Sequence, residues 1–319
     1  MTAGWRAWCL GLGMLCAVPA QAETAEDWLQ RMHDASQLDY QGVFIYERNG
    51  SFSSHQLWHA ATMHGERRER LLQLDGPAHE VLRVNGRTRC LSSDLQGPLA
   101  EGQVWPSREL DVGQLANWYV LRLLGSSRVA GRDAVVLGLL PRDPHRHAFE
   151  LHLDRQTALP LKSVSLNEQG QMLERFQFTS LQLQTPTSTD LQPGADCRTL
   201  DTDVSALSAA QTNDWQVGWL PPGFSAQGVI RRPVPGDGVP PLQCLLFADG
   251  LARFSVFVEH LGGLSVEEAH SQLGPTVAVS RRLSARSGEV MVTVVGEIPL
   301  GTAERIALSV REAQEQASD

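Results

Sequence analysis

The stretch Phe149-Glu150-Leu151-His152-Leu153-Asp154 alternates strictly between apolar and polar side chains. Because successive side chains of a strand point to opposite faces, this pattern predicts a strand, 147–154, in a sheet with one apolar and one wet face. Similar stretches lie on both sides of it, and 168–170 is typical of a turn between two of them. We therefore expect an antiparallel meander whose further strands are 134–140, 161–167 and 172–183.

The meander extends toward the N-terminus through two hairpins. Asn49-Gly50 and Asn85-Gly86 each separate two apolar stretches, and Asn-Gly is the strongest short signal for a two-residue hairpin turn. Thr24 and Asp27 are spaced as a capping pair, and apolar residues at helical spacing follow them. A sheet of this size has to curl into a barrel or half-barrel, with its apolar face covered by helices or by a ligand. The elements expected here are strands 43–46, 52–58, 79–84 and 87–91 and helices 24–38 and 112–124.

A change of composition divides the chain. From 185 to 213 the sequence is rich in Pro, Thr, Ser, Asp and Ala without sustained periodicity, which is typical of a linker or an irregular crossing. The block that follows has strand and helix patterns of its own, so we expect a first domain over 23–196, a linker over 197–213, a smaller α+β domain over 214–312 and a disordered tail over 313–319. In the second domain the expected elements are strands 252–259, 276–283 and 290–296, helix 266–273 and a last helix from Thr302.

The first residues predict export. Arg6 precedes an apolar run over 7–18, and Ala20 and Ala22 occupy the small-residue positions of a cleavage site. A run of about 12 apolar residues is shorter than the roughly 20 that span a bilayer. Cys16 follows Leu15 rather than a small residue, which argues against a lipoprotein. We expect a signal peptide over 1–22 and a mature chain that works in the periplasm.

Charge and cysteine content limit the function classes. The chain has 36 acidic and 27 basic residues, a net charge of −9, so it does not resemble a general nucleic-acid binder. Cys90, Cys197 and Cys244 remain after export, an odd number for an oxidising compartment. The simplest outcome is one bridge and one buried thiol. We expect Cys197 to pair with Cys244, because Cys90 lies on a strand that should be packed.

No pattern of a catalytic or cofactor site is present. The sequence contains no G-x-S-x-G elbow and no H-E-x-x-H helix, so neither an enzyme nor a cofactor is expected. On a strand, His145 and His147 would point to the same face, as a metal pair requires. Neither is accompanied by the cysteines or carboxylates of a strong metal site. Surface histidines are the simpler interpretation, and we expect no metal.

Clustered arginines are the better candidates for a binding surface. Arg67, Arg68 and Arg70 follow one another closely, and Arg286 lies near a second cluster in the smaller domain. Arginine forks bind carboxylate or phosphate through two hydrogen bonds, so such clusters suit an acidic peptide or a lipid phosphate. The alternative is a solvated surface. The residues proposed to contact a partner are Trp219, Phe224, Arg231, Arg232, Arg253, Arg281 and Arg282.

Several stretches of the chain, in order along its mature length, resemble the MucB/RseB family. The likeness weakens only in the linker. The stretches that carry it are Phe44-Ile45-Tyr46-Glu47-Arg48-Asn49-Gly50, Arg70-Leu71-Leu72-Gln73-Leu74-Asp75-Gly76-Pro77, Leu166-Asn167-Glu168-Gln169-Gly170, Trp219-Leu220-Pro221-Pro222-Gly223-Phe224, Asp249-Gly250-Leu251-Ala252-Arg253-Phe254-Ser255-Val256-Phe257 and Val294-Val295-Gly296-Glu297-Ile298-Pro299.

The resemblance implies a fold and a role. It implies an unclosed antiparallel barrel similar to LolA and LolB, with helices over its mouth. It also implies a periplasmic negative regulator of an extracytoplasmic-function sigma factor. Such a regulator binds the periplasmic part of a MucA- or RseA-type anti-sigma factor, shields it from proteolysis, and releases it when a lipid signal arrives. The signal is expected to carry an acyl chain, as a lipoprotein or lipopolysaccharide fragment does.

A second function remains open beside the regulator, namely a periplasmic carrier of lipids or lipoproteins that uses the same apolar barrel. The sequence also leaves open whether the chain forms homo-oligomers. In either function the barrel interior would hold the acyl chain. The residues proposed to line that cavity are Phe44, Trp118, Tyr119, Phe149, Leu151, Phe176 and Phe178.

Overall fold

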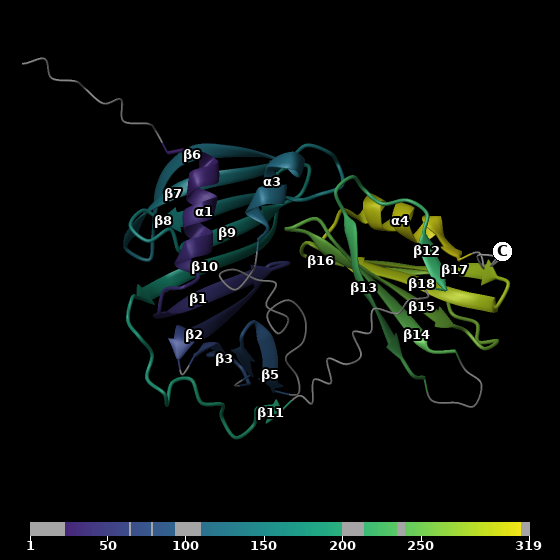
Figure 1. Cartoon of the computed structure of the whole chain (residues 1–319), viewed down its shortest axis with the longest axis horizontal. Coiled ribbons are helices and arrows are strands. Elements are labelled where there is room, and N and C mark those ends of the chain that lie inside the picture. The colour runs from purple at the N-terminus through teal and green to yellow at the C-terminus, as the bar shows by residue number, and fades with distance from the viewer. Residues whose placement is uncertain are drawn as a thin grey trace, which may run out of the picture.

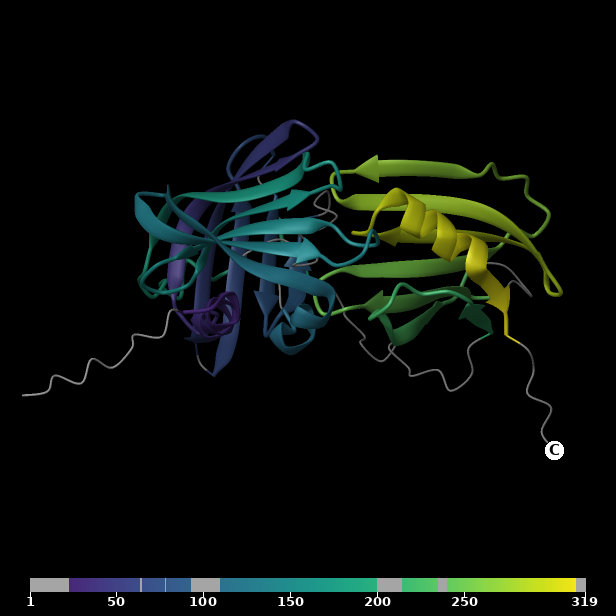
Figure 2. The same ribbon diagram turned by 90° about the horizontal axis from the view of Figure 1, so that it is seen from above.

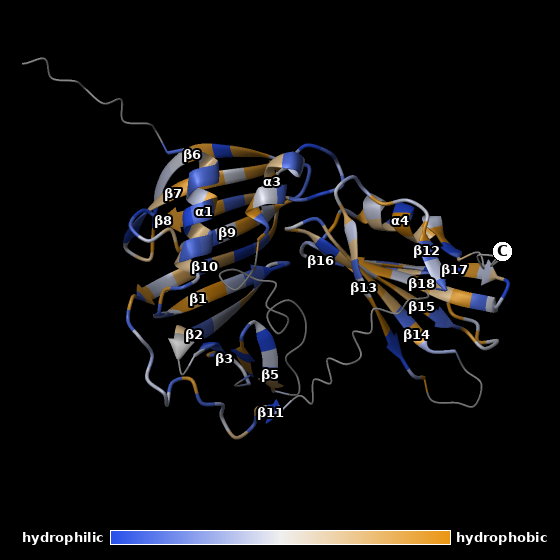
Figure 3. Ribbon diagram, in the orientation of Figure 1, coloured by the Kyte–Doolittle hydropathy of each residue, from blue (hydrophilic) through white to orange (hydrophobic). Residues whose placement is uncertain are grey.

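A computed structural model of the chain describes residues 23–63, 65–77, 79–92, 110–199, 214–234 and 240–313. The expected signal peptide, most of the expected linker and nearly all of the expected tail lie outside these residues. The described part forms two β-rich domains that lie side by side (Figure 1). Apolar and polar residues alternate along the strands of both (Figure 3), as the sequence pattern predicts.

The first domain is built on one antiparallel sheet of eleven strands. Its spatial order is β11-β5-β4-β3-β2-β1-β10-β9-β8-β7-β6, so β11 and β6 form two separate ends and the sheet curls without closing. Hydrogen-bonded neighbours are mostly neighbours in sequence, which is the expected meander. The strands are β1 (Tyr40–Arg48), β2 (Ser51–Met63), β3 (Glu66–Gln73), β4 (Glu80–Val84), β5 (Arg87–Leu91), β6 (Tyr119–Val129), β7 (Arg132–Pro141), β8 (Ala148–Asp154), β9 (Pro160–Leu166), β10 (Met172–Gln182) and β11 (Arg198–Thr199).

Both predicted Asn-Gly hairpins are confirmed. Asn49 and Gly50 have φ values of 51° and 73°, and Asn85 and Gly86 have 51° and 75°. Positive φ at both central residues defines the turn type whose twist matches that of paired strands, and asparagine and glycine adopt it at the lowest cost. The first of these turns projects toward the second domain, which gives it a role described below.

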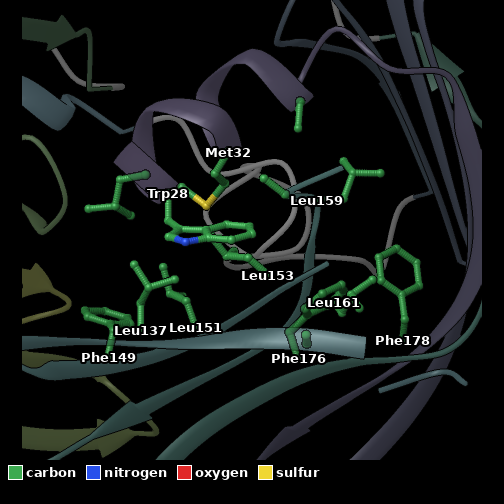
Figure 4. Packing of buried hydrophobic residues seen from close by; sticks show 14 of the residues in the cluster. Trp28, Met32, Leu137, Phe149, Leu151, Leu153, Leu159, Leu161, Phe176 and Phe178 are labelled. Carbon is green, nitrogen blue, oxygen red and sulfur yellow. The ribbon is translucent and has the colours of Figure 1, made fainter. Parts of the chain in front are cut away.

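Helix α1 (Ala25–Ala35) covers the mouth of the curled sheet. The Thr24 side chain accepts a hydrogen bond from the Asp27 backbone, and the Asp27 side chain accepts one from the Thr24 backbone, so the predicted capping pair is confirmed. Trp28 and Met32 point from the helix toward side chains of the sheet (Figure 4). These residues belong to one buried cluster that includes Leu137, Phe149, Leu151, Leu153, Phe176 and Phe178.

The expected helix over 112–124 is wrong beyond its first half. Helix α3 (Val112–Trp118) ends at Trp118, and Tyr119 begins β6. The apolar residues of 119–124 fit a strand as well as a helix, and pairing with the whole length of β7 decides in favour of the strand. Tyr119 is consequently buried in the sheet core, whereas Trp118 stays half-buried at the edge of the domain.

The second domain is a six-stranded antiparallel sheet with a helix across one face (Figure 2). Its spatial order is β13-β14-β15-β18-β17-β16, and β12 and β19 form a separate pair. The expected helix 266–273 is wrong: its second half is strand β16, which pairs with β17 across the turn at Gly274-Pro275. The elements are β12 (Trp215–Val217), β13 (Ser225–Arg232), β14 (Leu242–Ala248), β15 (Arg253–His260), β16 (Ala269–Leu273), β17 (Thr276–Ala285), β18 (Gly288–Gly296), α4 (Leu300–Ser309) and β19 (Val310–Glu312).

The expected disulfide is also wrong. Cys197 pairs with Cys90, with Cα atoms 5.4 Å apart, and Cys244 is the buried free thiol. The reason is the short strand β11, which directly follows Cys197 and pairs with β5, so that Thr199 lies opposite Cys90. Cys244 lies in the middle of β14, in the other domain.

The segment that leads to this disulfide is held against the first domain rather than hanging free. The Arg70 guanidinium donates to the Glu80 carboxylate at 2.6 Å and to the carbonyl of Asp190 at 3.1 Å. The backbone N–H of Gly194 donates to the same Glu80 carboxylate. Side chains of β3 and β4 therefore fasten the crossing before the expected linker to the sheet. The described part of the linker itself is held to β5 by the disulfide and by β11.

Candidate functional site

The two domains meet around one buried arginine. Arg146 lies in the loop between β7 and β8, and its side chain is 0% exposed. Its Nε atom donates to Asp249 Oδ2 at 2.5 Å, and the Asp249 side chain, in the turn between β14 and β15, is also 0% exposed. Arg146 further contacts the Asp143 carboxylate and the carbonyl of Pro222. A buried arginine that joins loops of both domains in this way fixes how the domains sit on each other.

Aromatic rings enclose the same guanidinium. Its central carbon lies 5.2 Å from the Trp118 ring centre and 5.0 Å from that of Phe224, at distances where a cation is attracted to the ring face. Gly223 packs directly on the Trp118 ring, and a Cβ atom at this position would overlap it. The Pro221-Pro222-Gly223 stretch of the second domain is therefore shaped to dock on α3.

A second contact joins the turn after β1 to the turn before β17. Asn49 Oδ1 accepts the backbone N–H of Gly274 at 2.8 Å, and the stem of Arg48 packs on Gly274 so closely that a Cβ atom there would overlap it. His147 Nε2 lies 3.2 Å from the carbonyl of Pro275. Because a carbonyl only accepts, this nitrogen carries the proton. Burial lowers the pKa of His147, so the ring is neutral in this contact.

A groove opens beside this second contact, on the face of the six-stranded sheet opposite α4. Its volume is about 810 Å³. Leu246, Ser255 and Phe257 form part of the floor, because they alternate along β14 and β15 with the residues buried under α4. Arg48, Arg232, Arg253 and Glu297 are its charged residues. The other lining residues are Gln227, Ile230, Leu242, Cys244, Phe247, Ala248, Phe254, Leu273, Thr276, Val295 and Gly296.

The structure brings together two of the residues expected to contact a partner. Arg232 and Arg253 both line the groove. Arg231 points elsewhere and pairs with Asp214, while Arg281 and Arg282 both contact Glu268. Trp219 and Phe224 lie at the domain contact instead: Trp219 packs edge-on to His145 and under Arg305, and Phe224 packs under Arg146.

The residues expected to line a lipid cavity lie together in the first domain. Phe44, Tyr119, Phe149, Leu151, Phe176 and Phe178 are all members of its buried cluster, with α1 packed over it. Trp118 lies at the margin of that cluster and faces the second domain. The α1 side chains Trp28 and Met32 belong to the same cluster.

Sequence reasoning missed the side chains that join the domains. Arg48, Asn49 and Asp249 lie in or beside stretches that the sequence marks as turns, and Arg146 lies between two histidines that suggested a metal. The sequence marks each of them only as a polar residue at or beside a loop, and many surface loops contain such residues. Arg146 and Asp249 are 103 residues apart, and Asn49 and Gly274 are 225 apart, so no local pattern could join them.

Two features are absent from the described residues. Within the ranges given above, no cluster of three or more His, Cys, Asp and Glu side chains is placed to hold a metal ion. In the same part of the chain, no helix combines the length and the apolarity needed to cross a membrane.

Comparison with known proteins covers both domains. The family model of the MucB/RseB N-terminal domain matches residues 24–196, and that of the MucB/RseB C-terminal domain matches 209–311. The sigma factor AlgU regulatory protein MucB of Pseudomonas aeruginosa is 57% identical over 305 residues, 94% of this chain and 95% of that protein. The sigma-E factor regulatory protein RseB of Escherichia coli K12 is 29% identical over 89% of each chain.

Solved structures of MucB also match both domains of this chain. The complex of P. aeruginosa MucA and MucB contains a chain that superposes with a TM-score of 0.78, at 55% identity, over 91% of this chain and 99% of that one. A crystal structure of MucB in complex with MucA(peri) gives a TM-score of 0.77, at 52% identity and the same coverage.

Proposed function

The chain belongs to the MucB/RseB family, and from this we propose that it regulates an extracytoplasmic-function sigma factor by binding the periplasmic region of a MucA-type membrane anti-sigma factor. In this role it works in the periplasm, by binding alone and without a catalytic step. While bound, it shields the anti-sigma factor from proteolysis.

One observation carries the proposal. The likeness to MucB runs through both domains at once, and MucB has been solved together with MucA at 55% identity to this chain. A partner surface that used both domains would require the domain arrangement to be preserved, and the TM-score of 0.78 over 91% of the chain includes that arrangement.

The groove is the best site for the partner in this structure. Its floor is mainly apolar, three of its four charged lining residues are arginines, and both domains contribute side chains to it. A peptide held in such a groove buries the backbone that a protease must grip in extended form. Binding in the groove is therefore sufficient to shield the anti-sigma factor from proteolysis.

The test is calorimetric titration of the chain with a synthetic periplasmic segment of a MucA-type anti-sigma factor. Leu273 lines the groove and is 49% exposed, so Leu273→Gln should weaken binding without disturbing the fold. Leu308 on α4 is 72% exposed and lies on the other side of the same sheet, so Leu308→Gln is the matched control. No binding of the segment by the native chain would end the proposal, and equal effects of both substitutions would remove the groove from it.

We further propose that an acyl-chain ligand in the first domain releases the partner. The ligand would take the place of Trp28 and Met32, which α1 inserts over the buried cluster. Displacing α1 would disturb α3, which packs beside it and carries Trp118 at the domain contact. By linkage, the ligand and the anti-sigma segment must then weaken each other's binding by the same factor. Titration of each at saturation with the other measures that factor, and unchanged affinities would favour a lipid carrier instead.

A further inference from the structure

The arginine at the end of β1 has an unusual position. Arg48 belongs to the first domain, but its stem lies on Gly274 of the second, and its neighbour Asn49 is hydrogen-bonded to the same glycine. The side chain therefore reaches the groove from the opposite domain, with its stem fixed by close packing. An arginine fixed in this way loses little further freedom when it binds a ligand.

The neighbours of Arg48 on β1 have partners within the sheet, whereas Arg48 has an unused donor. The hydroxyl of Tyr46 donates to Glu174 at 2.6 Å, and Glu47 pairs with Arg175 at 2.7 Å. Arg48 Nη1 is buried, and within the described residues it has no hydrogen-bond partner. Thr276 Oγ1, which lines the same groove, is also buried without one. Buried polar atoms almost always have partners, so these two indicate an acceptor supplied by another molecule.

The charge of the groove indicates what that acceptor is. Three of its four charged lining residues are arginines, on a chain whose net charge is −9. Such a local excess of positive charge selects an acidic group. A carboxylate fits the planar guanidinium through two parallel hydrogen bonds and can also accept from a threonine hydroxyl.

The floor indicates what surrounds the carboxylate. Leu246, Phe257 and Leu273 offer apolar surface, but Ser255 and Gln227 interrupt it. A mixed floor of this kind suits the alternating side chains of a peptide better than a continuous alkyl chain. The occupant is therefore a peptide segment with an acidic residue beside apolar ones.

We propose that Arg48, together with Thr276, binds an aspartate or glutamate of the anti-sigma segment and so determines which segment this chain accepts. The inference rests on the proposed function and adds to it the chemistry of the partner. It also gives the domain contact a purpose, because the arginine reaches the groove only while Gly274 holds its stem.

The experiment is a double-variant cycle between the full chain and the synthetic periplasmic segment. Arg48→Gln is combined with single Asp→Asn and Glu→Gln changes along the segment, and dissociation constants are measured by calorimetry. We expect Arg48→Gln to weaken binding by roughly 10- to 100-fold, since a hydrogen bond to a charged group contributes about that factor. For one acidic position of the segment, this loss should shrink to less than about threefold, because its carboxylate is already gone.

Two further variants distinguish a specific contact of Arg48 from nonspecific electrostatic attraction and from loss of the fold. Arg48→Lys keeps the charge and loses the fork, so it should restore only part of the affinity. Arg281 pairs with Glu268 outside the groove, so Arg281→Gln should change affinity by less than about threefold. Near-ultraviolet circular dichroism of Arg48→Gln should match the native chain.

The outcomes are distinguishable. If the segment binds and Leu273→Gln weakens it, but no acidic position couples to Arg48, the inference is wrong and the proposed function stands. If dodecyl phosphate binds with an affinity that depends on Arg48 while the segment does not, the occupant of the groove is an amphiphile and the inference is overturned. Failure of the native chain to bind the segment at all removes both.

Discussion

Replacing Arg146 by methionine should loosen the domain contact while leaving each domain folded. Methionine retains much of the volume but removes the ion pair to Asp249 and the hydrogen bond to the Pro222 carbonyl. Asp249 keeps two backbone partners, the N–H groups of Leu251 at 2.9 Å and Ala252 at 2.7 Å, but its charge stays buried without a cation. Removing one partner of a fully buried pair costs about 3–5 kcal/mol.

This cost destabilises only the closed arrangement of the domains, because opening exposes Asp249 to water. The ratio of open to closed molecules should therefore rise by about two to three and a half powers of ten. Two amides report it directly: Asp111 N–H donates to the carbonyl of Gly250 across the contact, at 3.1 Å, and Gly274 N–H donates to Asn49. Hydrogen exchange at both should accelerate by about this factor, provided that they exchange through opening.

Arg132→Met is the matched control. Arg132 Nε lies 2.5 Å from Asp154 Oδ2, and Asp154 is as buried as Asp249, but both residues of this pair belong to the first domain. The control should lower the stability of that domain and leave the Gly274 amide unchanged. The double variant Arg146→Met/Asp249→Asn should recover part of the loss, since the fully buried charge of Asp249 is then removed as well. Exchange of the Asp111 amide in Arg146→Met within about threefold of the native rate would refute the reasoning.

Three further predictions concern the first domain. Burial lowers the pKa of His55 to about 4, so the neutral ring stabilises the fold above the usual histidine pKa, and this contribution is lost as pH falls from about 6.5 toward 4. His55→Phe preserves the stack on Phe44 and should make the urea midpoint less dependent on pH over that window. An unaltered dependence would contradict this. Peptide mapping without reduction should give a Cys90–Cys197 bridge. Cys197→Ser should lower the stability of the first domain by about 5 kcal/mol in the chain-entropy model, because the bridge closes a loop of 107 residues. Cys244→Ser is the control that should leave the bridge intact. Trp28→Ala should cost about 3–5 kcal/mol of stability and open the cluster under α1 to a fluorescent fatty acid. Trp58→Ala is the control, because Trp58 lies on the outer face of the sheet, where its ring stacks on Arg70. Equal fatty-acid uptake by both variants would show that the cluster is not the ligand site.

Local patterns predicted the elements that depend on local physics. The alternation of Phe149, Leu151 and Leu153 placed β8 within one residue, and the two Asn-Gly pairs placed their turns, because side-chain period and turn dihedrals are set by a few adjacent residues. Thr24 and Asp27 placed the start of α1 for the same reason.

Features that depend on distant pairing were not predictable. Leu121 and Leu123 suit a helix or a strand equally well, and only pairing with β7 decides between them. Cys90 and Cys197 are 107 residues apart, and β11, the two-residue strand that brings them together, has no pattern that marks it. In the candidate site, Arg232 and Arg253 could be selected as basic residues, but their convergence with Arg48 needs the order of the sheet and the contact between the domains.

The disulfide at the end of the first domain also limits how far the two domains can separate. Thr199 is fixed beside β5, and Asp214 begins the described part of the second domain, so whatever lies between them spans at most about 50 Å at roughly 3.5 Å per residue. A tether of this length keeps two surfaces at an effective concentration on the order of millimolar. Rupture of the Arg146 contact is then a unimolecular event, and reclosure proceeds at a rate that dilution does not change. A contact of modest strength can thus be opened by a ligand and still recover quickly when the ligand leaves.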